Sequence, residues 1–332
     1  TLASTANNGR IVEEPLPGKD PVAPKKIIFL LAALVAGLFI PVGIIFIVEL
    51  LKYKIENRND VEQLTNVPIL GELPLCSHES SDKGMIVVRE NKNDMMEETF
   101  RGLRTNLLFM LQKEQKVILF SSTQPGEGKS FLTGNLAVSL AYLGKKVVVV
   151  GMDIRKHGLN RAFDLSKRQE GISNYLMNPD KDLFEFVQPS GISPNLDILL
   201  GGTIPPNPTE LVARDTLEKA VELLKARYDY VLLDTAPIGL VTDTAIISRV
   251  ADMCIYVCRV DVTPKAAFCY INVLRDEHKF DKLAVVINGI DLSKRRNTYG
   301  YGYGKKYGYG YGKHYGYGYG YNYGYGYAAT QK

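Results

Sequence analysis

Cysteine is scarce in this chain: only four of its 332 residues are cysteines. None is spaced with histidine as the ligands of a metal site would be, so the sequence gives no support to a zinc module. With a net charge of +4 and ordinary apolar content, the chain can instead bury one large core plus appendages. We expect the thiols to be reduced and buried. They are Cys76, Cys254, Cys258 and Cys269.

Charge is absent from residues 27–48, a run long enough to span about 33 Å as a helix. That length fits a bilayer, so we predict a transmembrane helix over residues 27–51. Gly37 and Pro41 do not contradict it, since membrane helices tolerate both. A buried core helix is one alternative. A signal peptide is another, but the run is too long and no small-residue cleavage pattern follows it.

An initiating methionine is also missing, and residues 1–26 are polar and rich in proline. We therefore expect a fragment of a longer protein that begins within an extended linker without a core of its own. Flanking basic residues barely orient the predicted membrane helix.

A nucleotide-binding P-loop is predicted where the apolar run 117–120 leads into residues 121–130. Gly126 and Gly128 let backbone N–H groups face a phosphate. Lys129 would neutralise the β and γ phosphates of ATP, and the Ser130 hydroxyl would bind Mg²⁺.

One residue departs from the usual loop pattern, because Thr123 stands where its first glycine is expected. Taken alone, the loop could be a chance match. The context argues otherwise: a strand precedes it, and an amphipathic helix from Phe131 to Leu143 follows, closed by Gly144.

Two aspartates follow later apolar runs. Asp153 comes after the run 147–150, and Asp234 ends the run 230–233. Open α/β sheets bind ligands at the carboxyl ends of their strands. Asp234 is therefore the predicted Mg²⁺ ligand, and Asp153 a second acid near the γ phosphate. Either acid alone would more commonly be a turn or cap carboxylate.

Apolar runs and helical segments alternate along the rest of the chain, which predicts an α/β fold with a doubly wound, mostly parallel sheet. Strands are expected at Val117, Val147, Leu196, Tyr230, Met253 and Leu283, and helices near Phe131, Gly171, Thr209, Asp243 and Lys265. The last strand ends near Asn288, whose amide could read a nucleotide base; a plain turn is nearly as good an interpretation.

A helix is also predicted from Asn93 to about Lys113, with Phe100, Leu103, Leu107 and Leu111 on one face. Charged residues occupy another face, where they could simply pair within the helix. They are Glu97, Glu98, Arg101 and Arg104. The stretch before this helix, from Lys52 to about Gly84, contains Pro68, Gly71 and Pro74, and we expect an irregular connector.

Tyrosine alternates with glycine in the tail, which holds thirteen of the chain's 20 tyrosines and no aliphatic residue up to Tyr327. We expect disorder. The tail could be a self-adhesive segment, a basic segment that binds anionic lipid, or a set of phosphate acceptors. The candidate acceptors are Tyr299, Tyr301, Tyr303, Tyr307, Tyr309, Tyr311, Tyr315, Tyr317, Tyr319, Tyr321, Tyr323, Tyr325 and Tyr327.

The chain resembles the bacterial tyrosine kinase family, the cytoplasmic half of polysaccharide co-polymerases, over nearly its whole length. Residues 126–130 resemble the family's Walker A motif, 153–156 its Walker A′ motif and 234–237 its Walker B motif. Glu98-x-x-Arg101-x-x-Arg104 resembles its subunit-contact motif, and the tyrosine cluster closes the pattern.

The resemblance implies a P-loop domain with the sheet of the MinD and ParA ATPases, flanked by a transmembrane helix and the tail. It divides the chain into a periplasmic linker (1–26), the transmembrane helix (27–51), a juxtamembrane connector (52–92), the kinase domain (93–292) and the tail (293–332). Catalytic roles fall to Lys129, Asp153, Arg155 and Asp234, and metal binding to Ser130, Asp153 and Asp234. Nucleotide binding falls to Gln124, Pro125, Gly126, Glu127, Gly128, Lys129, Ser130, Phe131 and Asn288.

The implied activity is transfer of the ATP γ-phosphoryl group to tail tyrosines of neighbouring subunits in a ring, an octamer in the nearest members. Implied partners are a tyrosine phosphatase, the capsule or exopolysaccharide machinery and membrane lipid, without nucleic acid. The inner membrane would hold the helix, with the kinase side cytoplasmic.

Two residues depart from the family pattern. Gly151 replaces a common aspartate, so Asp153 would carry the acid roles alone, and His157 stands where proline is frequent. The rival interpretation is a MinD- or ParA-type membrane ATPase switch without kinase activity. Gln124, standing where those ATPases carry a signature lysine, and the tyrosine tail argue against it.

Overall fold

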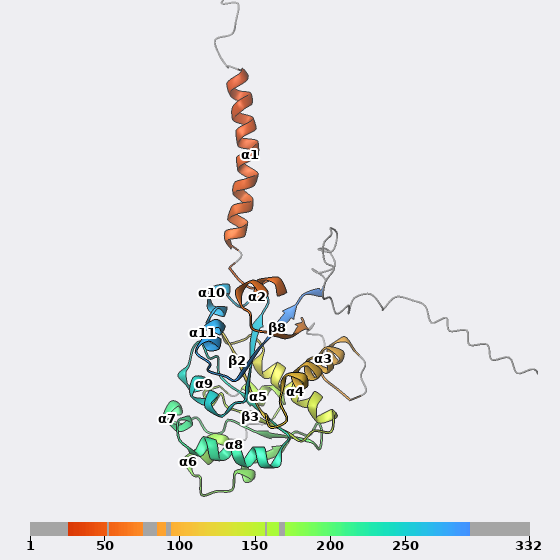
Figure 1. Ribbon diagram of the computed structural model, residues 1–332, viewed down its shortest axis with the longest axis vertical. Coiled ribbons are helices and arrows are strands. Elements are labelled where there is room, and N and C mark those ends of the chain that lie inside the picture. The colour runs from red at the N-terminus through yellow and green to blue at the C-terminus, as the bar shows by residue number, and fades with distance from the viewer. Residues whose placement is uncertain are drawn as a thin grey trace, which may run out of the picture. The chain divides into compact units, whose positions relative to one another are not determined.

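The computed structural model describes residues 26–51, 53–75, 85–90, 94–156, 158–165 and 170–292 (Figure 1). The tyrosine tail, Cys76 and His157 lie outside these residues. The strands are β1 (Ile69–Pro74), β2 (Val117–Ser122), β3 (Val147–Gly151), β4 (Val187–Pro189), β5 (Leu196–Leu199), β6 (Tyr230–Asp234), β7 (Met253–Arg259) and β8 (Lys282–Ile290).

Helices connect most of these strands. They are α1 (Lys26–Leu51), α2 (Arg58–Leu64), α3 (Met95–Met110), α4 (Lys129–Tyr142), α5 (Gly158–Ala162), α6 (Ile172–Met177), α7 (Pro208–Val212), α8 (Thr216–Arg227), α9 (Thr242–Ile247), α10 (Lys265–Phe268) and α11 (Tyr270–Asp276), with 3₁₀ turns η2 (Leu183–Phe186) and η3 (Ser248–Val250).

The eight strands form one sheet in the order β1-β8-β7-β2-β6-β3-β5-β4. Every pairing is parallel except that of the edge strand β4 with β5. The predicted doubly wound, mostly parallel α/β sheet is confirmed. Because β2 lies centrally, its carboxyl end opens beside those of β6 and β7, and the loop after it lies among them.

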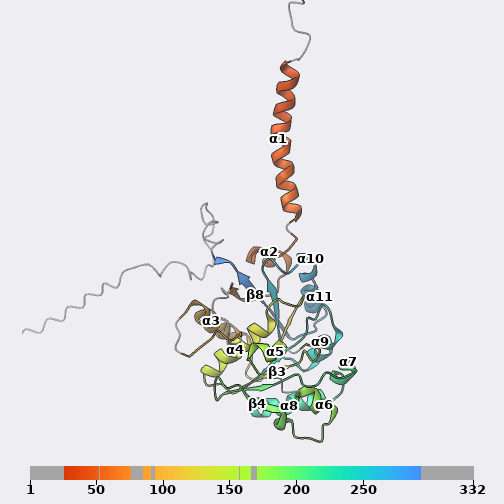
Figure 2. The same cartoon turned by 180° about the vertical axis from the view of Figure 1, so that it is seen from behind.

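The core lies in two layers, one on each face of the sheet. Along β2, Val117 and Leu119 belong to one buried cluster, whereas Ile118 and Phe120 belong to the other, as the two-residue period of a strand requires. Residues of α8 and α11 pack in the first cluster and those of α3 and α4 in the second, so helices cover both faces (Figures 1 and 2).

Helix α4 was predicted to be amphipathic, which is wrong. Every residue from Leu132 to Ala141 is buried, because the sheet, α3 and α5 enclose the helix. Small polar side chains such as Thr133 and Ser139 fit that space. In the sequence they give the helix an apparent polar face, although that face is buried. The helix ends as predicted at Gly144, whose φ of +81° suits a glycine.

The prediction of an irregular connector is also wrong, because it contains α2 and the edge strand β1, which pairs in parallel with β8. Gly71 was taken as a break. In the structure it permits close packing, since a Cβ there would lie 2.6 Å from Cδ2 of Leu103 on α3. The short strand β4 and helices α5 and α8 were not predicted at all.

Helix α1 contains one segment, Ile27–Phe46, that is long and apolar enough to cross a membrane by length and composition. None of that segment is buried against the rest of the described chain, which disfavours a core helix. Cys254 and Cys258 are buried on β7, where burial raises the pKa of both thiols, and Cys269 is partly buried.

Asn135, buried in the middle of α4, fastens the segment 85–88 to the domain. Its Oδ1 accepts hydrogen bonds from the backbone N–H groups of Val87 (2.7 Å) and Val88 (3.0 Å). Its Nδ2 donates to the carbonyl oxygens of Met85 (3.0 Å) and Phe131 (2.8 Å). One side chain thus satisfies four backbone groups.

We expect Asn135→Ala to lower the free energy of unfolding by about 2–4 kcal/mol, because buried backbone groups lose their partners and a cavity opens. Urea unfolding measures this. Limited proteolysis should show new cleavage near residues 85–88, whereas Asn178→Ala, at an exposed position after α6, should show neither effect. Unchanged stability of Asn135→Ala would contradict the assignment.

Candidate nucleotide site

Two left-handed glycines shape the loop between β2 and α4. Gly126 has φ +84° and Gly128 has φ +98°, a region that other residues enter only with strain. Space is a second restriction at Gly128, where a Cβ would lie 2.1 Å from Nδ2 of Asn288. The loop needs these two glycines. Thr123, at the expected first glycine, is buried and its hydroxyl lies 3.0 Å from the Tyr256 hydroxyl.

The buried carboxylate of Glu127 supports the loop by accepting hydrogen bonds. Oε2 of Glu127 accepts a hydrogen bond from the backbone N–H of Gln124 (2.8 Å), and its Oε1 accepts one from the Thr263 hydroxyl. Burial raises the pKa of Glu127, which these hydrogen bonds and the nearby Lys129 oppose. The sequence placed Glu127 among the nucleotide-binding residues, and the structure gives it an internal partner at each oxygen.

Side chains from β7 and β8 donate hydrogen bonds to carbonyl groups of the loop. Asn288 donates from Nδ2 to the carbonyl oxygen of Glu127 (2.8 Å), and Arg259 donates from Nη1 to that of Gly126 (3.0 Å). The amide of Asn288 therefore supports the loop, and the reading of a base by this residue stays a prediction. Thr263 and Arg259 were not predicted, because single polar residues after a strand carry no distinguishing signal.

The same support extends to the chain just after α1. The backbone N–H of Ile55 donates to the carbonyl oxygen of Thr263 (2.9 Å), and that of Lys265 donates to the carbonyl oxygen of Tyr53 (2.7 Å). Lys265 Nζ also pairs with Asp60 at 2.9 Å. The segment next to the membrane-length helix is thus bonded to the residue that holds Glu127.

Lys129 begins α4 with its side chain folded into the loop. Its Nζ donates to the Ser122 hydroxyl (2.8 Å), and only 8% of the residue is exposed. Burial lowers the pKa of Lys129, while Asp234, Glu127 and Asp153 oppose that shift. The amine therefore lies at the carboxyl end of β2, where the predicted phosphates would be.

Ser130 and Asp234 meet directly across the site. The Ser130 hydroxyl donates to Oδ2 of Asp234 at 2.6 Å, and Oδ1 of Asp234 is buried without a hydrogen-bond partner among the described residues. A buried carboxylate oxygen without a partner is costly unless a cation or water reaches it. These two oxygens fit Mg²⁺, which takes few protein ligands beside phosphates and water. Within the same described ranges, no group of three His, Cys, Asp or Glu side chains could hold a metal.

Asp153 lies close to this pair because its backbone N–H donates to the carbonyl oxygen of Asp234 (3.0 Å). Its Oδ1 accepts the backbone N–H of Lys156 (3.0 Å). Burial raises the pKa of Asp153, and it raises that of Asp234 to about 6 against the opposing effects of Ser130 and Lys129. The site holds two carboxyl groups that accept protons more readily than usual.

Arg155 points to a different partner. Its Nε and Nη2 bind both carboxylate oxygens of Asp243 at 2.6 and 3.0 Å, and the Thr209 hydroxyl also donates to Asp243 at 2.6 Å. The hydrogen bonds that Arg155 donates to Asp243 raise the pKa of Arg155. Asp243 was not predicted, because one acid in the first turn of a short helix normally reads as a helix-dipole contact.

Gly151 pairs with Asp234 across β3 and β6. A Cβ at this position would lie 2.9 Å from the backbone nitrogen of Gly201. The loop after β5 therefore lies where the family's usual aspartate side chain would begin. In this chain a carboxylate at position 151 requires that loop to move, which explains the glycine physically.

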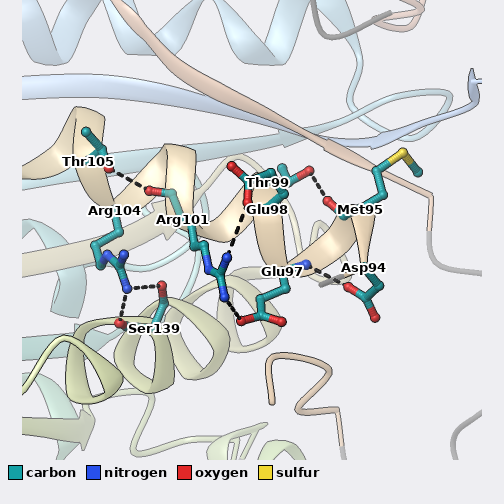
Figure 3. A network of polar contacts seen from close by, with 9 residues as sticks. All are labelled: Asp94, Met95, Glu97, Glu98, Thr99, Arg101, Arg104, Thr105 and Ser139. Carbon is teal, nitrogen blue, oxygen red and sulfur yellow. Dashed lines mark hydrogen bonds and ion pairs between the residues drawn. The ribbon is translucent and has the colours of Figure 1, made fainter. Parts of the chain in front are cut away.

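Helix α3 carries the predicted subunit-contact motif (Figure 3). Arg101 binds Glu97 at 2.6 Å and Glu98 at 3.5 Å. Arg104 instead donates to the carbonyl oxygen of Ser139 at 2.6 Å, which caps the last turn of α4. Glu97 was expected on a charged outer face, but it is buried because it packs toward α4.

Two further residues were predicted to bind nucleotide. Pro125 is exposed in the loop, and the ring of Phe131 meets that of Phe100 edge-on at 6.0 Å. The structure therefore brings together Lys129, Ser130, Asp153 and Asp234, whereas Arg155 is turned to Asp243. The thirteen tail tyrosines lie outside the described residues.

We expect Asp234→Asn to stabilise the protein in the absence of ligand. The raised pKa means that ionising Asp234 costs stability, which appears as the pH rises from about 4 through about 6. At pH 7 the cost is on the order of 3 kcal/mol. The variant should therefore unfold at a higher temperature than the parent at pH 7, and at nearly the same temperature at pH 4.

Nucleotide with Mg²⁺ should raise the melting temperature of the parent but not of Asp234→Asn, because the amide cannot supply the anionic oxygen. Asp180→Asn, at an exposed position, is the matched control and should behave as the parent. A melting temperature for Asp234→Asn at or below that of the parent at pH 7 would contradict the claim that ionised Asp234 destabilises the ligand-free protein.

Comparison with known proteins agrees with this geometry. The family model of an AAA domain matches residues 115–264. Tyrosine-protein kinase wzc of Salmonella typhimurium is 28% identical over 325 residues, which cover 91% of this chain and 43% of that protein. The chain spans less than half the length of this and other curated relatives that it matches.

Two solved kinase domains are similar over most of the folded part. The BceF tyrosine kinase domain is 30% identical with a TM-score of 0.62, covering 71% of this chain and 99% of that one. The kinase domain of Escherichia coli tyrosine kinase ETK is 26% identical with a TM-score of 0.62, covering 73% and 95%. With its P-loop, paired aspartates and α/β sheet, the chain belongs to the bacterial tyrosine kinase family.

Proposed function

We propose that this chain is a membrane-anchored protein-tyrosine autokinase that phosphorylates the tails of neighbouring subunits. The observation that carries the proposal is the buried pair of Ser130 and Asp234 beside Lys129, with one carboxylate oxygen left for a cation. The same chain holds thirteen tyrosines in its tail. A phosphate-transfer site and a bank of acceptors on one polypeptide support self-phosphorylation at high effective concentration.

The reaction follows from these groups. The hydroxyl oxygen of an incoming tyrosine attacks the γ phosphorus of ATP, while the bond from that phosphorus to the β-phosphate oxygen breaks. The tyrosine proton passes to Asp153, whose raised pKa suits a proton acceptor, and then to water. Phosphotyrosine and ADP are the products. Positioning and electrostatics supply most of the rate.

Lys129 would stabilise charge on the β and γ phosphates once it leaves the Ser122 hydroxyl. When bound by Ser130 and Asp234, Mg²⁺ would supply charge neutralisation to the phosphates. Asp153 would lie within reach of that ion or its waters. Loop N–H groups would cradle the phosphates, since Asn288 and Arg259 already occupy the carbonyl groups of Glu127 and Gly126.

The wider setting is part of the proposal. Helix α1 would anchor the chain in the inner membrane with the P-loop in the cytoplasm, where ATP is, and residues 1–26 in the periplasm. A ring of subunits, an octamer, would form through Glu98, Arg101 and Arg104. Added phosphates reverse the charge of the basic tail, which would loosen the ring. A phosphatase would reset it during polymerisation and export of capsule or exopolysaccharide.

The rival function is a membrane ATPase switch that hydrolyses ATP without modifying itself. The P-loop geometry favours neither function, because both need the same phosphate site. The tyrosine tail favours the kinase, and mass measurement separates the two directly.

Incubation with MgATP should raise the intact mass of the dephosphorylated chain in steps of roughly 80 Da, one per phosphate. Lys129→Met should gain nothing because it loses phosphate charge stabilisation, and a chain truncated after Arg296 should gain nothing because it lacks the acceptors. ADP release from the parent without a gain in mass would establish the ATPase switch instead.

Glu98→Ala tests the ring separately from folding. Glu98 is about half exposed and makes only a 3.5 Å ion pair, so its loss should cost little stability. It should still shrink the assembly seen by native mass spectrometry. Arg104→Ala should shrink the assembly and also lower the melting temperature, because α4 loses its cap. Assemblies of parental size from both variants would exclude this helix as the subunit contact.

A further inference from the structure

An open apolar groove of about 480 Å³ lies against the start of the P-loop. Thr123 and Gln124 form one side, and the other sides come from the loop after β6 and from α10 and α11. Leu240 is 61% exposed and Val273 is 42% exposed, although both are apolar. Small residues, Ala266 among them, leave room between these walls.

The groove adjoins the reacting end of the nucleotide site. Nζ of Lys129, which marks the β and γ phosphates, is bonded to Ser122, the residue before Thr123. The loop that carries Leu240 begins at Asp234, and Ser121 fastens it: the backbone N–H of Ile238 donates to the Ser121 hydroxyl at 3.0 Å. The groove therefore borders the first residues of the loop that would bind the phosphates.

Buried aromatic residues behind the lining hold Thr123 and helix α10 in place. The hydroxyl of Tyr256, on β7, lies 3.0 Å from that of Thr123, and its ring meets Phe268 of α10 edge-on at 6.0 Å. Tyr256 and Phe268 are both fully buried. The walls are thus held in place without an occupant, which lowers the entropy cost of binding one.

The tail of the chain has the chemistry that such a groove would take. Tyrosine buries a ring and keeps a hydroxyl, and glycine on either side leaves the backbone unobstructed. In an extended tail, alternate residues share one side, so the tyrosines would recur about every 7 Å. At about 3.4 Å per residue, Tyr327 can lie more than about 100 Å from Leu292, which suffices to reach a neighbouring copy.

We propose that this groove is the acceptor site, in which a tail tyrosine of a neighbouring copy packs its ring between Leu240, Ala266 and Val273. The inference rests on the proposed kinase function and adds the determinants of its protein substrate. The ring lies along the apolar walls, and its hydroxyl is directed to the phosphate beside Gln124. Recognition is of an aromatic ring flanked by glycine, which makes many tail positions equivalent acceptors.

Binding can be measured without phosphate transfer, because the thiol of Cys269 lines the groove and is only partly buried. We expect a peptide of residues 299–312 to slow alkylation of Cys269 in the full-length chain severalfold, as read by peptide mass spectrometry. The same peptide with every tyrosine replaced by serine should not. If both peptides leave the alkylation rate unchanged, the groove is not the site.

Kinetics supply the second measurement. Ala266→Phe fills the groove and Val273→Ser removes an apolar wall, so each should raise KM for the peptide about tenfold. The affinity for ATP should not change, because neither residue is among those whose side chains hold the P-loop by hydrogen bonds, which are Glu127, Thr263, Arg259 and Asn288. Leu223→Ser, an exposed apolar position on α8, is the matched control and should leave both quantities as in the parent. Parental KM values for both groove variants would overturn the proposal.

Failure of the two proposals can be told apart. If the parent gains no phosphate but the tyrosine peptide still protects Cys269, the kinase function fails and the aromatic groove stands. If the parent phosphorylates its tail while the peptide gives no protection, the kinase stands and the groove proposal fails. Protection that rises with protein concentration in a chain truncated after Arg296, which lacks the tail, would assign the groove to a folded surface of a second copy.

Discussion

The buried carboxylate of Glu127 is the contact on which the nucleotide site depends. It closes the P-loop onto itself through Gln124 and joins the loop to Thr263. A loop with two glycines has many backbone conformations in the unfolded chain, so ordering it costs conformational entropy. The hydrogen bonds that Gln124 and Thr263 donate to this buried acid offset that cost before any ligand arrives. Glu127 takes the N–H of Gln124, and the other loop N–H groups would face a phosphate. The chain after α1 shares the same support through Thr263.

The site holds buried groups of both charges, each suited to a ligand group of the opposite charge. Lys129 is buried with its pKa lowered, and Asp234 is buried with its pKa raised. Neither shift helps the fold by itself, since each reflects a charged form that has lost water. Phosphate would give Lys129 an anionic partner beside the Ser122 hydroxyl, and a divalent cation would give Oδ1 of Asp234 the partner that it lacks among the described residues. Strained groups of this kind are typical of functional sites, where stability is exchanged for ligand affinity.

The sequence predicted the sheet and the placement of Asp153 and Asp234, because buried parallel strands are continuous apolar runs and their carboxyl ends lie on one edge. It did not predict contacts that depend on residues distant in the sequence. Gly71 permits close packing against Leu103 and does not break the chain's regular structure. Arg155 forms an ion pair with Asp243, which lies far from it in the sequence. Helix α4 looks amphipathic only because it buries small polar residues. Thr263 and Arg259 gave no local signal at all.

Helix α4 connects the phosphate site to helix α3, which carries the proposed subunit contact. Its first turn holds Lys129 and Ser130, and its last turn is capped by Arg104 of the helix that carries the subunit-contact motif. Because α4 is enclosed on all sides, it cannot bend to absorb a displacement and would transmit it as a rigid body. If α3 contacts a neighbouring subunit as proposed, a displacement of α3 would change the free energy of ligand binding at the phosphate site. Ligand binding would change the free energy of that contact by the same amount, since coupling between two sites is reciprocal.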